Sequence, residues 1–215
     1  MNQHLVSGQG NTPLIKGIAC LLSATDSHPL ELAARVAKVE PASGTAENMS
    51  TTSTLETVVR LAMHIERSRL DRTTLPIYLG REQLMDGASA LLGKDPTLES
   101  RDALRLLALL LDKLLRGGKG SCQAKLDGLV LSAMEQRSLA ACSPNTMAVV
   151  RGSWRHKSRN QLGHASWLDV VEAALWCFWH SDDLLGGEAL LGVLLGRDER
   201  VRLVYGLLAG AFYLN

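Results

Sequence analysis

The most constraining feature of this sequence is a long helical segment, residues 99–116, that is apolar almost all the way round. Its centre reads ALRLLALLLDKLL, and charges interrupt it only at Arg105, Asp112 and Lys113. A helix with apolar side chains on every face must be enclosed by other elements. We therefore expect this helix at the centre of the fold. The same charges keep the run shorter than the roughly 20 apolar residues that a membrane span needs.

Further helices are predicted along the chain by apolar periodicity and by capping residues such as Thr12 and Thr54. They cover residues 13–22, 30–39, 55–69, 81–93, 122–137, 166–180, 186–196 and 201–213. The last helix carries Gly206 and Gly210 on a face of small residues, which favours close packing. Because strand-like alternation is absent, we predict an all-α protein with a single domain over residues 1–215. Flexible loops are expected at about 40–54 and 143–165.

Composition narrows the class of protein. The 215 residues carry a net charge of +1, which makes nucleic acid and membrane surfaces poor candidate partners. The first eleven residues have neither a basic start nor an apolar core, so no signal peptide is expected. The four cysteines are far apart in sequence, and we expect them to be reduced and mostly buried. These features together predict a cytoplasmic protein.

The last third of the chain carries four ordered motifs. ASWLDVVEAALWCFW (165–179) is followed by SDD (181–183), LLGRDER (194–200) and VYGLLAGAFY (204–213). In order, spacing and residue type they resemble the ADP-ribosylglycohydrolases, the all-α hydrolases that include dinitrogenase-reductase-activating glycohydrolase. The corresponding family segments read GYVVDTLEAALW, an Asp/Ser turn, NLGDDADT and AVYGQLAGAYYG. The resemblance implies a compact, multi-helix ADP-ribosylglycohydrolase-like domain.

A weaker resemblance lies near the N-terminus. GNTPLIK (10–16) is similar to the family's GNGSLMR motif, with Lys16 in place of the usual arginine. LELAARVAK (30–38) resembles the helix that follows it, whereas residues 50–145 match the family only in being helical. Because the family's early Thr-Asp-Asp segment precedes the GNGSLMR motif, the resemblance implies a domain truncated at its N-terminus and lacking those carboxylates.

The resemblance also implies a two-magnesium site. Magnesium prefers oxygen ligands, and paired metals can activate water for attack at the anomeric carbon. Alignment on Gly196 places Asp198 on the first aspartate of the family's Asp-x-Asp-Thr/Ser motif. Arg200 then replaces the second aspartate and Val201 the Thr/Ser, and a guanidinium repels a dication. Two interpretations of Asp198 stay open: a surviving magnesium ligand, or a charge at a helix N-terminus paired with Arg200.

Other candidate residues would bind substrate. RGSWRHKSRN (151–160) places four cations around one tryptophan, a combination that can hold a pyrophosphate and stack an adenine. The same segment also suits single-stranded nucleic acid, or is a solvated basic loop. Each remaining candidate has a structural alternative, as a surface, capping or hydrogen-bonding residue. The full set of substrate-binding candidates is Asn11, Lys16, Trp154, Arg155 and Asp169, the last with Glu172 as a possible carboxylate partner.

Three functions follow from these observations. The first is an ADP-ribosylglycohydrolase-like protein with an incomplete metal site, impaired in catalysis but retaining a cleft for ADP-ribose or an ADP-ribosylated protein. The second is an active hydrolase that removes ADP-ribose from modified proteins, with magnesium as its cofactor. The third is an interaction scaffold without a ligand. The missing early motif and the substituted late motif favour the first or the third.

Overall fold

The computed structural model describes residues 12–21, 51–71, 77–141, 143–194 and 198–215. Their regular structure consists of ten α-helices and two 3-10 helices without any strand, which confirms the predicted all-α fold. The α-helices are α1 (Pro13–Leu21), α3 (Thr51–Asp71), α4 (Ile77–Ala90), α5 (Leu98–Arg116), α6 (Cys122–Leu129), α7 (Ala133–Leu139), α8 (Pro144–Val150), α9 (Trp167–Trp179), α10 (Leu184–Val193) and α11 (Glu199–Tyr213). The 3-10 helices are η2 (Ser153–Arg155) and η3 (Arg159–Gln161).

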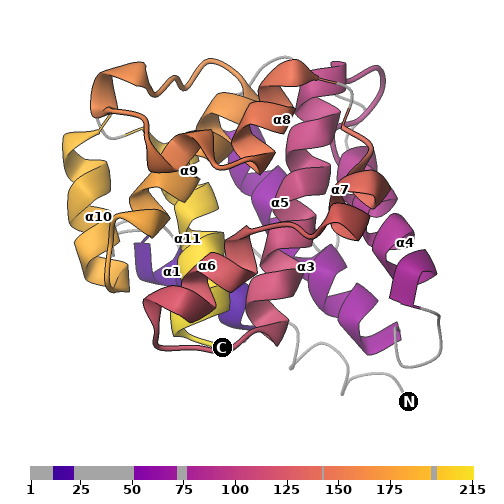
Figure 1. Cartoon of the computed structure of the whole chain (residues 1–215), viewed down its shortest axis with the longest axis horizontal. Helices are drawn as coiled ribbons and strands as arrows, with labels where there is room; N and C mark the ends of the chain where they lie inside the picture. The colour runs from indigo at the N-terminus through magenta and orange to yellow at the C-terminus, as the bar shows by residue number, and fades with distance from the viewer. Residues whose placement is uncertain (1–11, 22–50, 72–76, 142, 195–197) are drawn as a thin grey trace.

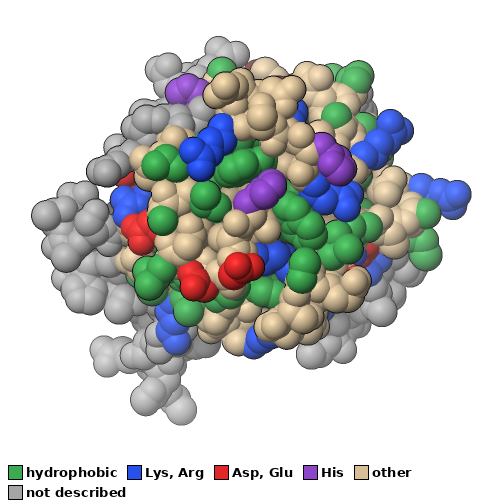
Figure 2. Space-filling model, turned by 60° about the vertical axis from the view of Figure 1, so that its left-hand side comes forward, with side chains coloured by type: hydrophobic (Ala, Val, Ile, Leu, Met, Phe, Trp, Pro, Cys, Tyr) green, Lys and Arg blue, Asp and Glu red, His purple; other side chains and the backbone are tan. Residues whose placement is uncertain are grey.

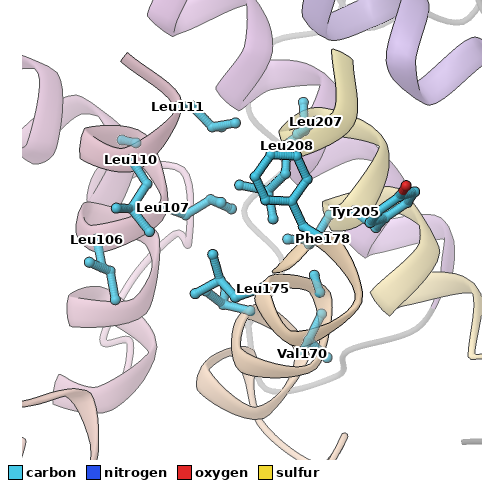
Figure 3. Packing of buried hydrophobic residues seen from close by; sticks show 14 of the residues in the cluster. Leu106, Leu107, Leu110, Leu111, Val170, Leu175, Phe178, Tyr205, Leu207 and Leu208 are labelled. Atoms are coloured by element: carbon cyan, nitrogen blue, oxygen red, sulfur yellow. The ribbon is translucent and has the colours of Figure 1, made fainter. Parts of the chain in front are cut away.

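Helix α5 is enclosed by other helices, as its sequence predicts (Figure 1). Its apolar residues from Ala103 to Leu115 are buried, and they pack against α4, α9 and α11. Figure 3 shows Leu107 of α5 directed toward the side chains of Phe178 and Leu208 on α9 and α11. One continuous apolar core therefore joins these three helices. No helix among the described residues is long and apolar enough to cross a membrane.

Helices α1 and α11 cross with backbone against backbone. A Cβ atom on Gly17 would collide with the carbonyl oxygen of Gly206 and would lie 2.6 Å from the Cα atom of Gly210. A Cβ atom on Gly210 would collide with the carbonyl oxygen of Pro13. Since Pro13 lies at Gly210 and Gly17 at Gly206, the two helices are antiparallel. The small residues of the last helix serve the close packing that the sequence predicts.

Helices α9 and α11 run in the same direction and are tied together at both ends. Just before α9, His164 contacts Asp198, which is the N-cap of α11. At the other end, the Tyr213 hydroxyl donates to the carbonyl oxygen of Ser181 over 3.3 Å. Between them, the fully buried Tyr205 donates to the carbonyl oxygen of Leu184 over 3.0 Å. The N-termini of α9 and α11 therefore lie at one end of the core.

Lys125 fixes helix α6 against the opposite end of α9. Its ammonium donates to the carbonyl oxygens of Phe178, at 2.7 Å, and of Ser181. It also lies 4.5 Å from the centre of the Phe178 ring. Burial lowers the pKa of Lys125. The carbonyls at a helix C-terminus and the faces of aromatic rings both attract a cation, and so they support the ammonium inside the protein.

One predicted helix is wrong as a continuous element. The sequence pattern predicts a helix over residues 122–137, but α6 ends at Leu129 and α7 begins after Ser132. The Ser132 hydroxyl accepts a hydrogen bond from the amide of Glu135, and the Glu135 carboxylate accepts one from the amide of Ser132. The capping box accepts hydrogen bonds from amides that, in a continuous helix, would donate to backbone carbonyls of the preceding turn. It therefore allows a new helix to start at this point.

Two predicted loops also need correction. Residues 143–165 are not an open connection, since they contain α8, η2 and η3. Helix α3 begins at Thr51, so residues 51–54 are helical and Thr54 is a buried residue rather than a cap. The expectation of mostly buried cysteines is also wrong among the three that the structure describes. Cys177 is buried, whereas Cys20 and Cys122 are exposed. The predicted helix 30–39 and the rest of the first loop lie outside the described residues.

The glycine crossing predicts the effect of adding one methyl group. Gly17→Ala should lower the free energy of unfolding by about 1–3 kcal/mol, because the methyl group would be forced against the backbone of α11. The measurement is urea unfolding followed by circular dichroism. Gly192→Ala on α10 is the matched control, since a Cβ atom there meets nothing within 4 Å. The control should be neutral or stabilising by up to about 1 kcal/mol. Equal effects of the two substitutions would contradict the crossing.

Candidate functional site at the start of helix α11

Asp198, the residue that the resemblance assigns to metal binding, is the centre of a charged cluster. As the N-cap of α11 it accepts a hydrogen bond from the backbone amide of Arg200 at 2.9 Å. The Arg200 guanidinium lies 2.6 Å from one carboxylate oxygen of Asp198, and the Nδ1 atom of His164 lies 2.7 Å from the same oxygen. Arg200 also donates to the backbone carbonyl of His164 over 2.8 Å. The cluster thus joins the segment before α9 to the start of α11.

Asp198 is held in its charged form. Partial burial opposes ionisation, but the hydrogen bonds from Arg200 and His164 outweigh it and lower the pKa of Asp198 to about 2. Both carboxylate oxygens already accept hydrogen bonds from Arg200. The geometry matches the second sequence interpretation, a charge at a helix N-terminus paired with Arg200.

The donor set around Asp198 does not fit a pair of magnesium ions. Each magnesium ion needs several oxygen ligands in octahedral geometry, and Asp198 offers oxygens that already bind a guanidinium. Within the described part of the chain, no group of three or more His, Cys, Asp or Glu side chains is placed so as to hold a metal ion. Asp198 as a magnesium ligand therefore remains a hypothesis without a completed coordination sphere.

The basic segment 151–160 is a folded platform. The indole nitrogen of Trp154 donates to the carbonyl oxygen of Val149 over 3.1 Å. The indole nitrogen of Trp176, on α9, donates to the backbone carbonyl oxygen of Lys157 over 2.9 Å. Buried Glu172 accepts hydrogen bonds from the Ser153 hydroxyl at 2.5 Å and from the Lys157 ammonium at 2.6 Å. Trp154 thus fixes the segment to α8, and Trp176 and Glu172 fix it to α9. The segment is ordered, in contrast to the flexible loop that the sequence predicts over residues 143–165.

The placement of Trp154 does not support the expected stacking on an adenine. Only 2% of Trp154 is exposed, because its ring packs edge-on against Trp179 with centroids 5.6 Å apart. Arg155 lies beside it, with the guanidinium carbon 5.3 Å from the ring centre. Gly152 allows this arrangement, since its φ of +88° is left-handed and a Cβ atom there would touch the Arg155 guanidinium. Trp154 therefore acts as a core residue that supports the cations around it.

The other predicted residues are dispersed. Asp169 completes a capping box at the start of α9, where it accepts from the amide of Ser166 at 3.1 Å. Asp169 and Glu172 do not act as a pair, because each carboxylate serves a different structural contact. Lys16 is exposed on α1, and Asn11 lies outside the described residues. The structure brings only Asp198 and the N-terminus of α9, near Asp169, to the same end of the core.

A pocket of about 550 Å³ lies next to Asp198, and sequence reasoning did not identify it. Its apolar wall comes from α10 and includes Leu185, which is 71% exposed. Its polar wall contains Arg202, which binds Glu188 at 2.6 Å and Glu199 at 3.3 Å. Figure 2 brings the side of the molecule that carries α10 forward, and there basic, acidic, histidine and apolar side chains are intermixed.

Sequence reasoning also missed His164, which is 34 residues away from its partner Asp198. No local spacing rule connects these two positions. The available signal was indirect: His164 stands directly before the capping segment of α9, and Asp198 directly before α11. A contact between them follows only once α9 and α11 are known to be parallel neighbours.

Comparison with known proteins gives one informative match. A stretch of 71 residues, 33% of this chain, is 34% identical to the ADP-ribosylarginine hydrolase Tri1 of Pseudomonas putida (strain GB-1). The chain spans about a fifth of the length of that protein, 19%. No family model matches the chain. The match supports a distant relationship to ADP-ribosylhydrolases, in agreement with the all-α fold.

The charged cluster predicts an acid-dependent contribution to stability. Asp198→Asn keeps a good N-cap but removes the ion pair, and should lower the free energy of unfolding at pH 7 by about 1–2 kcal/mol. Because folding lowers the pKa of Asp198 from 3.8 to about 2, its contribution is complete above about pH 4 and is lost as the pH falls through 2. The difference between wild type and variant should therefore shrink over this range in acid titrations of unfolding. Glu199→Gln, next to it and more exposed, should cost at most about 0.5 kcal/mol, and a larger loss than for Asp198→Asn would contradict the cluster's role.

The platform predicts resistance to protease. Glu172→Gln removes the charge that holds Lys157, so trypsin should cleave after Arg155, Lys157 or Arg159 several times faster than in the wild type. Cleavage is followed by mass spectrometry under native conditions. Glu82→Gln, an exposed position on α4, is the control and should leave the rate unchanged. Rapid cleavage of the wild type at these three sites would contradict an ordered platform.

Proposed function

We propose that this chain is an ADP-ribosylhydrolase-like protein that binds an ADP-ribosyl group beside the start of α11 without cleaving it. The contact of Arg200 with Asp198, at 2.6 Å, is the observation that carries the proposal. Position 200 is where the resemblance implies the second metal-binding aspartate. A fixed guanidinium at this position replaces a metal ligand with a cation.

Loss of the two-metal chemistry follows from electrostatics. To bind magnesium, Asp198 would have to release Arg200 and His164, and its pKa of about 2 reflects how strongly these partners hold it. The incoming dication would then lie close to a guanidinium that stays charged at any physiological pH. Arginine at position 200 therefore disfavours magnesium both by occupying the ligand and by repelling the ion.

Retained binding is supported by the cations of the platform. Arg151 and Arg159 are exposed, and the segment that carries them is fixed by Glu172. A guanidinium binds phosphate oxygens in bidentate geometry, so a pyrophosphate is a fitting ligand for such a surface. Because the platform is already folded, binding would not require ordering of the segment. His164, which follows this segment in the chain, contacts Asp198 at the start of α11.

A second candidate function is favoured by the comparison itself. The relative from Pseudomonas putida is named as an ADP-ribosylarginine hydrolase, and a chain related to it is a candidate for the same reaction with magnesium. This alternative requires Asp198 to exchange Arg200 for a metal ion. It also requires further carboxylates in a coordinating arrangement, and among the described residues no group of three or more His, Cys, Asp or Glu side chains is placed so as to hold a metal ion. A scaffold without any ligand is the third candidate, and the burial of Trp154 favours it over adenine stacking.

Calorimetric titration with ADP-ribose distinguishes the three functions. The proposal expects binding with the same affinity in magnesium and in a chelator, and no release of ADP-ribose from ADP-ribosylarginine. Arg159→Gln should weaken binding, because it removes an exposed cation of the platform. Asp198→Asn should leave the magnesium independence unchanged.

Two results would overturn the proposal. Binding or hydrolysis that requires magnesium, and that Asp198→Asn abolishes, would identify a working metal site and the second function. Absence of any ADP-ribose binding by a folded wild-type protein would leave the scaffold. Arg69→Gln on α3 is the charge control, since Arg69 pairs with Glu66 outside the candidate site. An equal loss of affinity in Arg69→Gln would mean that general charge, and not the platform, attracts the ligand.

A further inference from the structure

Helix α10 presents an apolar face to solvent. It lies at the outer edge of the molecule, on the left in Figure 1, and packs against α9 and α11. The exposed residues of this helix are Leu185, Gly186, Ala189, Gly192 and Val193. Leu185 is 71% exposed and Val193 is 63% exposed. Because the solvent face of a helix is normally polar, a face without any polar side chain is typical of an interaction surface.

The exposed residues are arranged symmetrically about Ala189. Gly186 and Gly192 lie three positions before and after it, and the larger Leu185 and Val193 lie four positions before and after it. Since a helix turns by about 100° per residue, all of these positions share one face. A two-fold axis through Ala189 sets Leu185 of one copy against Val193 of the partner subunit, and it sets the two glycines against each other. The face is thus complementary to itself in an antiparallel helix pair, a symmetry that an unrelated partner would not require.

The shape of the surface also suits a second helix. The small residues lie at the centre of the face, where the two helices would come closest, and the larger ones lie at its ends. The pocket of about 550 Å³ described above borders the face, since Leu185, Ala189 and Gly192 are among its lining residues. The two-fold axis places Val193 of the partner subunit against Leu185, at the rim of this hollow.

The charges around the face permit this pairing. Glu188 is the only ionisable side chain of α10, and its carboxylate lies 2.6 Å from the guanidinium of Arg202 on α11. Because Glu188 precedes Ala189 by one position, the two-fold axis sets it beside Leu190 of the partner subunit and not beside a second Glu188. The pairing therefore brings no like charges of α10 together, and the dipoles of antiparallel helices attract each other.

We propose that α10 is a dimer interface, at which a second copy of this chain binds in an antiparallel, two-fold arrangement centred on Ala189. A helix of 10 residues is about 15 Å long, so α10 alone buries less than the roughly 800 Å² per partner of a standard interface. The dimer is therefore a weak one that forms at high protein concentration.

Analytical ultracentrifugation of the full chain, at concentrations up to about 1 mM, tests the dimer. The wild type should shift from monomer toward dimer as its concentration rises. Leu185→Glu should raise the dissociation constant at least tenfold, because it buries a charge against Val193 of the partner subunit. Met134→Glu is the matched control and should change the constant less than twofold, since Met134 is 70% exposed on α7, far from α10 in Figure 1. Circular dichroism confirms that both variants are folded.

Cysteine cross-linking tests the two-fold register. Ala189→Cys should form a disulfide between two copies, because the axis brings this position against itself. Leu185→Cys should not link to itself, since the two copies of position 185 lie about 12 Å apart along the antiparallel pair. A mixture of Leu185→Cys and Val193→Cys should link. The wild type controls for the natural cysteines.

Three results would overturn the proposal. They are a wild type that stays monomeric at every concentration, equal weakening by Met134→Glu, and linkage of Leu185→Cys to itself as readily as Ala189→Cys. A folded, monomeric wild type would leave the apolar face to a partner other than this chain. The measurements contain no nucleotide, so their outcome is independent of the proposed function.

Discussion

The contact on which the rest of the structure depends is the crossing of α1 and α11 without intervening side chains. Three glycines, Gly17, Gly206 and Gly210, let the two backbones touch, and a Cβ atom at Gly17 or Gly210 would collide with the facing backbone. The short distance between the α1 and α11 backbones fixes where α11 lies against α9 and α5. The Tyr205 hydroxyl can then donate to the carbonyl oxygen of Leu184 at the start of α10, and Asp198 can contact His164. A packing constraint near the middle of α11 therefore positions the charged cluster at its start.

At each end of the α9–α11 pair, a charged side chain lies against helix-terminal backbone groups of opposite partial charge. At the C-terminal end, a buried ammonium, Lys125, lies against helix carbonyls and aromatic faces. At the N-terminal end, the carboxylate of Asp198 caps the amides of α11, as the positive end of the helix dipole favours. Arg200 pairs with the Asp198 carboxylate and also donates a hydrogen bond to the carbonyl oxygen of His164. Each end is thus internally satisfied, and Asp198 has a structural role that is complete without a metal ion.

The parts of the fold that the sequence predicted well are those decided by local patterns. The central position of α5 followed from its apolar faces, and the close packing of α11 from its glycines. The errors arose where short-range polar contacts override periodicity, as at the Ser132 capping box, or where order comes from distant partners. Segment 151–160 is polar and looks like a loop, yet Glu172 and Trp176 hold it from α9. The pairing of His164 with Asp198 depends on the relative direction of two helices, which no single-sequence pattern encodes.

In the alignment that the resemblance implies, Arg200 stands where the family has its second metal-binding aspartate, and under the proposed function this difference is a change of role and not simple damage. If an aspartate stood there, two carboxylates at the N-terminus of α11 would repel each other unless a cation bound between them. An arginine supplies that positive charge permanently, from the chain itself. The cluster is then stable without a cofactor, and it links α11 to His164 in the segment before α9. In this view the guanidinium of Arg200 occupies the electrostatic role of a metal ion, preserving the shape of the surface while removing a Lewis acid from it.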